Sequence, residues 1–119
     1  MSWEVIATAE FETWFKAQAK PAQAKLDTWI AVLADQGPTL PVQYSKPIVT
    51  SRHRMRELRM QVKGNPFRVL HVFDPVRNVV LLLGGDKTGD DRWYEANVPK
   101  ADALYDAHLE ELRRKERDK

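Results

Sequence analysis

The sequence predicts a single α+β domain in which helices pack against an antiparallel β-sheet. Three observations carry this prediction. Apolar residues recur at three- and four-residue spacing near both ends of the chain, alternating polar and apolar residues fill the middle, and short turn signals separate the segments. With 119 residues, the chain is long enough for one hydrophobic core but not for two. We therefore expect residues 1–119 to form one domain.

The first third of the chain predicts a short strand followed by two helices. Residues 3–6 form an apolar-rich run that indicates a strand, and Thr8 can then cap a helix that carries carboxylates in its first turn. Pro21 interrupts this helix but suits the first turn of a second helix, which we expect to end at Gly37-Pro38. The two helices are expected to form an antiparallel hairpin with their aromatic and leucine residues in the core.

The middle of the chain predicts three antiparallel strands. Residues 56–63 alternate polar and apolar side chains, residues 67–73 form the returning strand, and residues 79–83 are apolar enough to be covered on both faces. Turn signals at residues 63–66 and 74–78 separate these strands.

The segments on either side of these strands are expected to be irregular. We expect residues 38–47 to be a connector, Gly84-Gly85 to end the third strand, and residues 86–92 to form a polar loop. Pro99 then suits the first turn of a final helix. The charged end of that helix mixes signs, which is typical of a solvated surface.

The composition excludes several classes of protein. The chain has no cysteine, which rules out disulfides, thiolate nucleophiles and Cys-based zinc sites and is typical of a reducing cytoplasm. It has no apolar run of eighteen residues and no signal-peptide pattern at its start. We therefore expect a cytoplasmic protein without a membrane segment.

Positive charge is concentrated in one segment of the chain. Residues 46–68 carry seven basic residues and a single acid, Glu57, so this window has a net charge of +6 whereas the whole chain has +2. Such asymmetry attracts polyanions, and the guanidinium fork suits phosphate oxygens. We predict phosphodiester binding on the open face of the strand pair, with plain solubility as the alternative. The basic residues are Lys46, Arg52, Arg54, Arg56, Arg59, Lys63 and Arg68.

The loop after the third strand is a second candidate site. Its Gly, Lys and Thr residues suggest a phosphate-binding loop, but Asp86 rather than glycine precedes Lys87, so we do not expect nucleoside triphosphate binding. Asp86, Asp90 and Asp91 lack the regular spacing of a calcium loop. We therefore expect neither a metal nor another cofactor.

The chain has three histidines with different expected roles. His53 lies inside the basic segment and either transfers protons near neutral pH or is one more exposed polar residue. His71 occupies a core-alternating position in the second of the three strands, and His108 lies on the final helix without an obvious partner. We expect both of these to be structural.

Six short motifs follow one another in a fixed order along the chain. They are SKPI at 45–48, MRELR at 55–59, FRVL at 67–70, FDP at 73–75, LLGGDKTG at 82–89 and WYE at 93–95. Together they resemble the phage-derived, HigB-like branch of the RelE/ParE toxin superfamily. The resemblance covers nearly the whole chain, including its order of strand, two helices, three strands and terminal helix.

This resemblance implies a RelE-like α+β domain that acts as the toxin of a type II toxin–antitoxin pair. Such toxins cleave mRNA, usually in the ribosomal A site, and are silenced by an antitoxin. The expected activity is a metal-independent attack of the RNA 2′-OH on the adjacent phosphorus, which leaves a 2′,3′-cyclic phosphate. The expected partners are mRNA on the ribosome and a helix-turn-helix, DNA-binding antitoxin.

The resemblance also assigns site residues by their positions. Basic residues and a late tyrosine surround the scissile phosphate in RelE-type toxins. Arg59 and Arg68 match the groups expected to hold the phosphate oxygens, and Lys87 matches the group expected to neutralise developing charge. Tyr94 or His53 is expected to transfer protons or to stack on a base. RNA-binding residues are expected at Lys46, Arg52, Arg54, Arg56, Lys63 and Arg92.

Three other functions fit parts of the same sequence. A ParE-like gyrase poison would have the fold without a phosphate-stabilising site. A non-catalytic RNA-binding module would use the same arginines for salt-dependent affinity. A plain interaction domain would show neither property.

Overall fold

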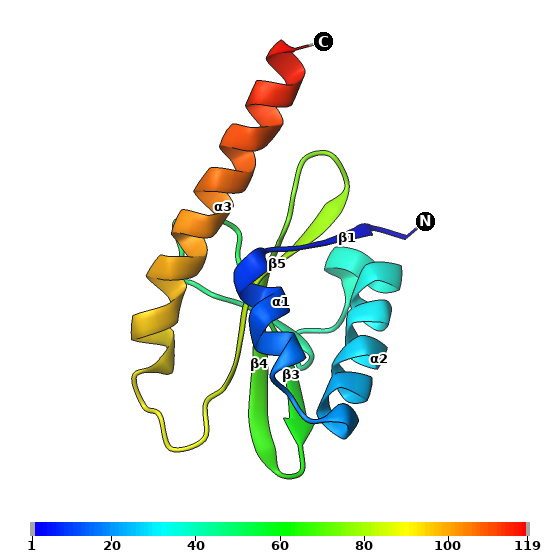
Figure 1. The fold of residues 1–119 in the computed structure, drawn as a ribbon, viewed down its shortest axis with the longest axis vertical. Helices are drawn as coiled ribbons and strands as arrows, with labels where there is room; N and C mark the ends of the chain where they lie inside the picture. Colours follow the sequence, from blue (N-terminus) through cyan, green and yellow to red (C-terminus); the bar gives the residue numbers. More distant parts are fainter. Residues whose placement is uncertain (1, 119) are drawn as a thin grey trace.

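The structure, a computed structural model, describes residues 2–118, so that Met1 and Lys119, the two ends of the predicted domain, lie outside the described residues. Figure 1 shows three layers, with α3 on one side of a β-sheet and α1 and α2 on the other. This arrangement confirms the predicted α+β class. In chain order the elements are β1 (Glu4–Ala7), α1 (Ala9–Lys16), α2 (Lys20–Gln36), the short 3-10 helix η1 (Gly37–Thr39), β2 (Ser45–Pro47), β3 (Arg56–Val62), β4 (Asn65–Phe73), β5 (Asn78–Asp86) and α3 (Trp93–Arg117).

The N-terminal part of the chain forms as its sequence predicts. Thr8 caps α1, because its hydroxyl accepts a 3.0 Å hydrogen bond from the Phe11 backbone N–H. Pro21 lies in the first turn of α2, where a missing N–H costs no helical hydrogen bond. Figure 1 shows α1 and α2 running in opposite directions. None of the helices within residues 2–118 is long and apolar enough to cross a membrane.

The sheet has the strand order β1-β5-β4-β3-β2. Strands β2 to β5 pair antiparallel, as expected for the last three, whereas β1 runs parallel to β5 at one edge. The expectation that residues 38–47 form only a connector is wrong for Ser45–Pro47, which pair with Arg56–Leu58 of β3. Three residues are too few to show an alternating pattern, so this strand is defined by its partner rather than by its own sequence.

The hairpin between β3 and β4 closes through the two residues Lys63 and Gly64. Both have positive φ angles, 50° and 81°, as a type I′ turn requires. This turn pairs Val62 with Asn65 and therefore sets the register of the two strands. Every later pair on the hairpin, including those of the candidate site, follows from this register.

Two predicted boundaries around β5 and α3 are wrong. β5 does not end at Gly84-Gly85 but continues to Asp86, with Gly84 paired to Val69 and Gly85 to Arg68. A Cβ atom on Gly84 would lie 2.3 Å from Trp14 of α1, and one on Gly85 would lie 2.4 Å from Trp93 of α3. The glycines therefore admit an indole ring on each face of the strand instead of ending it.

The final helix begins at Trp93, not at Pro99, which lies inside α3. Proline at this position removes the N–H that would bond to the Glu95 carbonyl. Glu95 is exposed, so water can solvate that carbonyl and the helix continues. The earlier start matters for the site, because it places Tyr94 in the first turn of α3.

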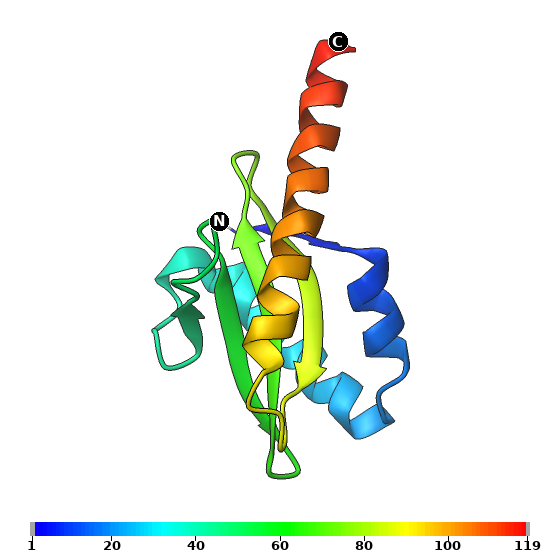
Figure 2. The same ribbon diagram turned by 90° about the vertical axis from the view of Figure 1, so that its left-hand side faces the viewer.

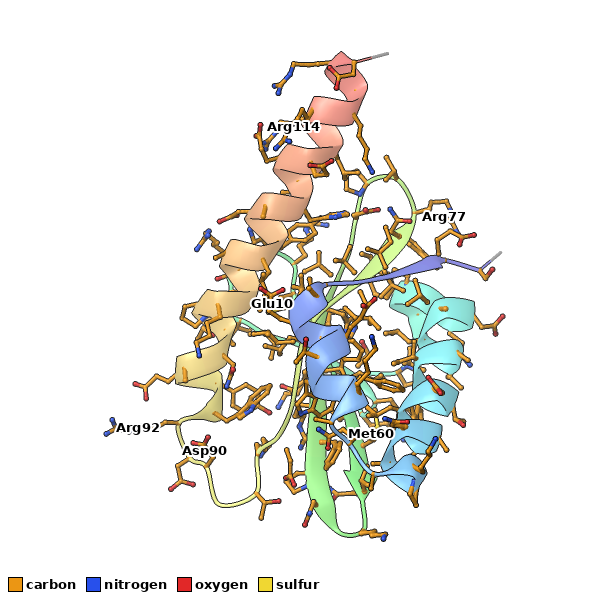
Figure 3. The ribbon with its side chains drawn as sticks, in the orientation of Figure 1. Glu10, Met60, Arg77, Asp90, Arg92 and Arg114 are labelled. Atoms are coloured by element: carbon orange, nitrogen blue, oxygen red, sulfur yellow. The ribbon has the colours of Figure 1, made fainter. Side chains whose placement is uncertain are left out.

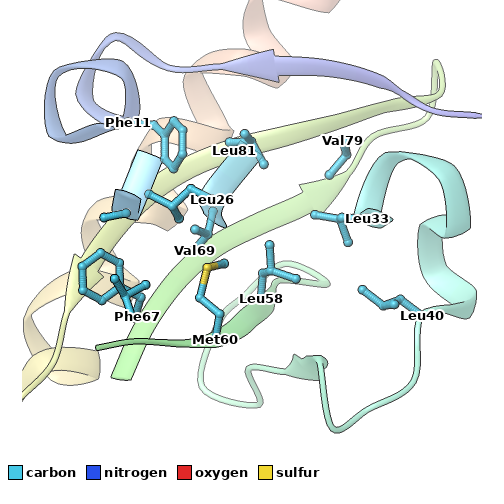
Figure 4. Packing of buried hydrophobic residues seen from close by; sticks show 12 residues of the cluster. Phe11, Leu26, Leu33, Leu40, Leu58, Met60, Phe67, Val69, Val79 and Leu81 are labelled. Carbon is cyan, nitrogen blue, oxygen red and sulfur yellow. The ribbon is translucent and has the colours of Figure 1, made fainter. Parts of the chain in front are cut away.

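The core occupies both faces of the sheet. On one face, side chains of α1 and α2 such as Phe11 and Leu26 meet Leu58 and Val69 of the strands (Figure 4). On the other face, α3 packs on β4 and β5, and Figure 2 shows this helix crossing the sheet while its C-terminal half extends beyond it. The expectation that this second face is open is therefore only partly met, because α3 leaves just part of it uncovered.

Candidate active site

The uncovered part of the sheet carries two arginines and one buried glutamate. Arg59 of β3 and Arg68 of β4 are register partners, and like charges directly opposite each other destabilise a sheet. Glu57, two residues before Arg59 and therefore on the same face, supplies the counter-ion. Its Oε1 atom lies 2.9 Å from Nε of Arg68 and 3.7 Å from Nε of Arg59. Glu57 and Arg68 are each 4% exposed, so this is a buried ion pair.

Tyr94 joins this group from the first turn of α3. Its hydroxyl donates a 2.7 Å hydrogen bond to Oε1 of Glu57, and Nε of Arg68 lies 3.3 Å from the same hydroxyl. Arg68 also donates a 2.9 Å hydrogen bond to the Phe67 carbonyl. Burial raises the pKa of the Tyr94 phenol, and the hydrogen bond to Glu57 raises it further. The phenol is therefore a protonated donor at neutral pH.

Lys87 approaches Tyr94 from the loop after β5. The Lys87 ammonium lies 5.7 Å from the centroid of the Tyr94 ring, within the range of a cation–π interaction. The backbone N–H of Lys87 donates a 3.0 Å hydrogen bond to the Pro66 carbonyl, which ties the start of the loop to β4. The structure thus brings Lys87 close to the Tyr94 side of the site.

A groove of about 320 Å³ opens over this group and is called the catalytic groove below, after the function proposed for it. Lys46 of β2 lies on its rim as the register partner of Glu57 and is exposed. Of the residues predicted from the sequence, Lys46, Arg59 and Tyr94 line this groove together with Glu57. Arg68 is connected to the groove by its ion pair with Glu57. The full lining is Lys46, Pro47, Ile48, Val49, Thr50, Glu57, Arg59 and Tyr94.

His53 is placed elsewhere, against the middle of α3. Its Nε2 atom lies 2.7 Å from Oδ1 of Asp106, and its ring packs edge-on against Tyr105 at 4.8 Å between centroids. Arg52 forms ion pairs with Asp106 and with Asp102. Neither His53 nor Arg52 is among the described residues that line the catalytic groove. This part of the basic segment fastens the loop before β3 onto α3.

The remaining basic residues are also dispersed. Arg56 lies on the opposite face of β3, where it donates hydrogen bonds of 2.6 Å and 3.0 Å to the carbonyl and hydroxyl of Ser45. Arg54 is exposed on the loop before β3, and Lys63 is exposed at the tip of the hairpin. Arg92 extends outward from the loop that joins β5 to α3 (Figure 3), with its side chain 87% exposed. The charge cluster of the sequence is therefore not one continuous surface.

Glu57 belongs to the site, although it is not among the site residues predicted from the sequence. Two features of the sequence mark it. Glu57 is the single acid in a strongly basic segment, and it shares its strand face with Arg59 because the two residues are two positions apart. A single acid in a basic strand, on the same strand face as an arginine, is a candidate counter-ion for more than one of the basic residues.

The other two histidines have partners within the fold. His71 is fully buried, its Nδ1–H donates a 3.0 Å hydrogen bond to the Val69 carbonyl, and Nε2 lies 3.4 Å from the Ser45 hydroxyl. Burial lowers the pKa of His71 to about 4. His108 lacks an obvious partner in the sequence, but in the structure its Nε2 atom lies 2.7 Å from Oδ2 of Asp74.

Two of the three aspartates at the end of β5 and in the loop after it accept hydrogen bonds from within this segment. Oδ1 of Asp86 accepts hydrogen bonds from the N–H and the hydroxyl of Thr88, and Asp90 accepts one from the N–H of Arg92. Across residues 2–118, no group of three or more His, Asp or Glu side chains is arranged to hold a metal ion.

The fold resembles that of solved RelE toxins. The chain superposes on a free-state mutant of the Escherichia coli toxin RelE with a TM-score of 0.59 at 8% identity, over 81% of this chain and 95% of the other. The TM-score is 0.57 at 17% identity for the toxin–antitoxin complex RelBE2 of Mycobacterium tuberculosis, over 72% of this chain and 99% of the matched chain. At these identities the likeness is one of fold.

Sequence comparison identifies the family. Residues 13–106 match the family described as phage-derived protein Gp49-like (DUF891). The M. tuberculosis protein "Putative toxin HigB3" is 41% identical over 104 residues, which is 82% of this chain and 86% of the relative. "Putative toxin HigB2" of the same organism is 36% identical over 83 residues, which is 67% of this chain and 41% of that relative. The chain belongs to the Gp49-like family and is related to the HigB toxins, as its motifs predict.

Proposed function

We propose that this toxin is an endoribonuclease that cleaves mRNA without a metal ion. The observation that carries the proposal is a proton acceptor, a proton donor and several cations around one groove. Glu57 and Tyr94 share a 2.7 Å hydrogen bond at its floor, and Arg59 and Lys46 border it. These are the groups that attack by a ribose 2′-OH on the neighbouring phosphorus requires.

Protons move between the substrate and two side chains in this mechanism. Glu57 takes the proton of the attacking 2′-OH as the new oxygen–phosphorus bond forms. Tyr94 gives its proton to the 5′-oxygen as the old bond breaks, so the products are a 2′,3′-cyclic phosphate and a free 5′-OH. Because the Tyr94 hydroxyl and the Glu57 carboxylate are hydrogen-bonded, the proton gained by Glu57 can then return to Tyr94. Both groups end in their starting states.

The cations divide into binding and supporting roles. The Arg59 side chain is 37% exposed and, with Lys87, is available to the non-bridging phosphate oxygens. Arg68 is buried and already bonds to Glu57, Tyr94 and the Phe67 carbonyl. We therefore assign Arg68 to pairing with Glu57 and orienting it, rather than to the direct phosphate contact that the family resemblance implies.

The proposed setting is the ribosomal A site in the cytoplasm, with an antitoxin as the silencing partner. The basic residues around the groove support an RNA substrate. A RelE-fold neighbour solved as a toxin–antitoxin complex supports an antitoxin partner. The resemblance to HigB-like toxins favours a helix-turn-helix protein in that role.

Induction of the protein in cells, with sequencing of mRNA 5′-OH ends and of ribosome positions, tests this function. We expect new ends at a fixed offset within the A site. Glu57→Gln and Tyr94→Phe should each reduce cleavage by about 10²-fold or more, because each removes a positioned proton-transfer group. His53→Gln is the matched control and should keep most activity, since His53 is bonded to Asp106 instead of lining the groove. DNA damage without such ends would overturn the proposal in favour of gyrase poisoning.

A further inference from the structure

A second and larger groove begins at Arg59 and leads to α2. It measures about 460 Å³ and is called the α2 groove below. Arg59 lines both this groove and the catalytic groove, so the two meet at its side chain. None of the sequence motifs points to this space. The residues that line it are Lys25, Trp29, Gln43, Tyr44, Arg59, Met60, Gln61 and Arg68.

The α2 groove exists because β2 is shorter than β3. The β2 pairing stops at Ser45, opposite Leu58, and the next contact is the 2.8 Å hydrogen bond from the Arg59 N–H to the Tyr44 carbonyl. Beyond this point α2 supplies the neighbour, because Nζ of Lys25 donates a hydrogen bond to the Gln61 carbonyl. The groove therefore follows the outer edge of β3 where no strand covers it.

Aromatic rings and positive charge meet in this groove. The rings of Trp29 and Tyr44 lie 5.0 Å apart between centroids, inclined by 32°, and both residues are partly exposed. Lys25 and Arg59 supply positive charge, whereas Arg68 is buried and paired with Glu57. None of the described residues that line the groove is acidic. Aromatic faces beside a cationic track are the combination with which proteins bind single-stranded nucleic acid.

We propose that the α2 groove binds the single-stranded RNA that adjoins the scissile phosphate. A base stacks on the Trp29 and Tyr44 rings, and Lys25 contacts the phosphate beside that base. This inference rests on the proposed function, since Arg59 joins the groove to the proposed site of cleavage. A peptide strand is a poorer occupant, because Lys25 already bonds the Gln61 carbonyl that an added strand would need.

Photo-crosslinking with a non-cleavable RNA tests the placement directly. The probe is a single-stranded oligonucleotide with 2′-O-methyl riboses, which lack the attacking 2′-OH, and with 5-iodouridine at successive positions. Iodouridine crosslinks to aromatic side chains on which it stacks, so mass spectrometry of the full-length protein should find the crosslinks at Trp29 or Tyr44. Bound RNA whose crosslinks lie only outside the α2 groove, or an oligonucleotide that does not bind, would overturn the inference.

Matched variants separate stacking from packing. Tyr44→Phe and Trp29→Phe keep an aromatic face, whereas Tyr44→Leu and Trp29→Leu keep apolar bulk without one. We expect each Leu variant to bind the oligonucleotide about tenfold more weakly than its Phe counterpart, because stacking on one ring contributes that much per base. Equal affinities of the Leu and Phe variants would mean that the rings only pack. Thermal unfolding of each variant, measured alongside, confirms that it is folded.

A charge control and a cleavage assay complete the design. Lys25→Gln should weaken binding, whereas Lys115→Gln removes the same charge from the exposed end of α3 and should not. The mRNA ends produced by the wild-type protein are mapped in parallel. Crosslinks in the α2 groove without 5′-OH ends would support this groove and contradict the proposed cleavage. Cleavage without crosslinks in the groove would contradict this inference alone.

Discussion

At the scale of single residues, Glu57 serves both stability and the proposed chemistry. It is buried, and it forms ion pairs with two arginines that the sheet register places opposite each other. A buried charge that loses its partner is strongly destabilising, whereas an apolar pair of similar size is often neutral. The carboxylate should therefore be required for folding only as long as Arg68 remains.

Substitutions at Glu57 and Arg68 test this dependence. We expect Glu57→Gln to lower the free energy of unfolding by about 3 kcal/mol, because it leaves Arg68 buried without a counter-ion. The double variant Glu57→Leu/Arg68→Met should recover most of that stability while remaining inactive in RNA cleavage. Urea unfolding and mapping of mRNA ends measure the two properties. A double variant that is less stable than Glu57→Gln would contradict the assignment of the ion pair.

His71 makes stability depend on pH. Its pKa in the folded protein is lowered to about 4 by burial, against an ordinary value of 6.5, and the Arg56 charge acts in the same direction. Between pH 6.5 and pH 4, His71 therefore binds a proton in the unfolded chain but not in the folded protein. Stability is fully present above pH 6.5 and falls as the pH drops toward 4, with a loss on the order of 2 kcal/mol by pH 5. Chemical unfolding at pH 7 and pH 5 measures this loss.

The matched variant for this prediction is His71→Gln. It should be less stable overall, yet its loss of stability between pH 7 and pH 5 should be smaller by about 2 kcal/mol.

The two aspartates with lowered pKa values affect stability at lower pH than His71 does. A hydrogen bond with His108, against the effect of burial, lowers the pKa of Asp74 below 3.8, and one with His53 lowers that of Asp106. The aspartates therefore lose their contribution to stability only below about pH 4, outside the interval from pH 7 to pH 5. If His71→Gln kept the pH dependence of the wild-type protein between pH 7 and pH 5, His71 would be excluded as its cause.

At the scale of elements, the two glycines of β5 connect the strand to opposite layers. Gly84 faces Trp14 of α1, and Gly85 faces Trp93, the neighbour of Tyr94 in α3. An added methyl group at either position would overpack the contact and cost about 1–3 kcal/mol. Only one of the two changes, however, displaces the helical turn that carries a proposed catalytic group.

Gly84→Ala and Gly85→Ala should therefore differ in activity more than in stability. We expect both to lower the melting temperature, because each Cβ atom would meet an indole ring within 2.4 Å. Gly85→Ala should also reduce mRNA cleavage, since it moves Trp93 and with it Tyr94. Gly84→Ala should leave the cleavage rate per folded molecule close to wild type. Equal losses of activity in the two variants would contradict the separation of the two faces.

The sequence predicts those elements whose signal is local. Alternation identifies β3, and the turn signal at residues 63–66 marks its hairpin with β4. The length of β5 and the start of α3 are not predictable from glycine and proline statistics. Gly84 and Gly85 make room for Trp14 and Trp93, and these contacts exist only in the folded protein. The short strand β2 depends on its partner strand in the same way.

The candidate site divides along similar lines. The sequence names Arg59, Arg68 and Tyr94, which the fold brings together, since basic strand residues and a late tyrosine are visible as motifs. It does not separate His53 from them, because the contact of His53 with Asp106 joins residues 53 positions apart. Charge density along the chain indicates a polyanion-binding segment but not which of its cations are already paired.

At the scale of the whole molecule, only part of the basic segment lies at the two grooves. Lys46 and Arg59 line the catalytic groove, Lys87 lies over the ring of Tyr94, and Lys25 lies in the α2 groove. If these four contact phosphates, the logarithm of the RNA affinity should fall with the logarithm of salt concentration at a slope of about −3, or about −0.7 per contact. Binding titrations from low to moderate salt measure this slope.

Two single charge removals show which cations take part. Lys46→Gln should reduce the magnitude of the slope by about 0.7, because it removes one phosphate contact. Arg52→Gln removes the same charge but should leave the slope unchanged, since Arg52 is paired with Asp102 and Asp106. A larger effect of Arg52→Gln would place the RNA path over α3 instead of over the grooves.

The two-residue turn at Lys63-Gly64 has a consequence for how such proteins can diverge. Its length alone keeps Arg68 opposite Arg59 and on the same side of the sheet as Glu57. A single residue inserted into or deleted from the hairpin that shifted the pairing by one residue would turn either Arg68 or both Glu57 and Arg59 toward the α1 and α2 layer. We therefore expect related proteins with this site to differ in the identity of the residues at this hairpin tip more often than in the number of those residues.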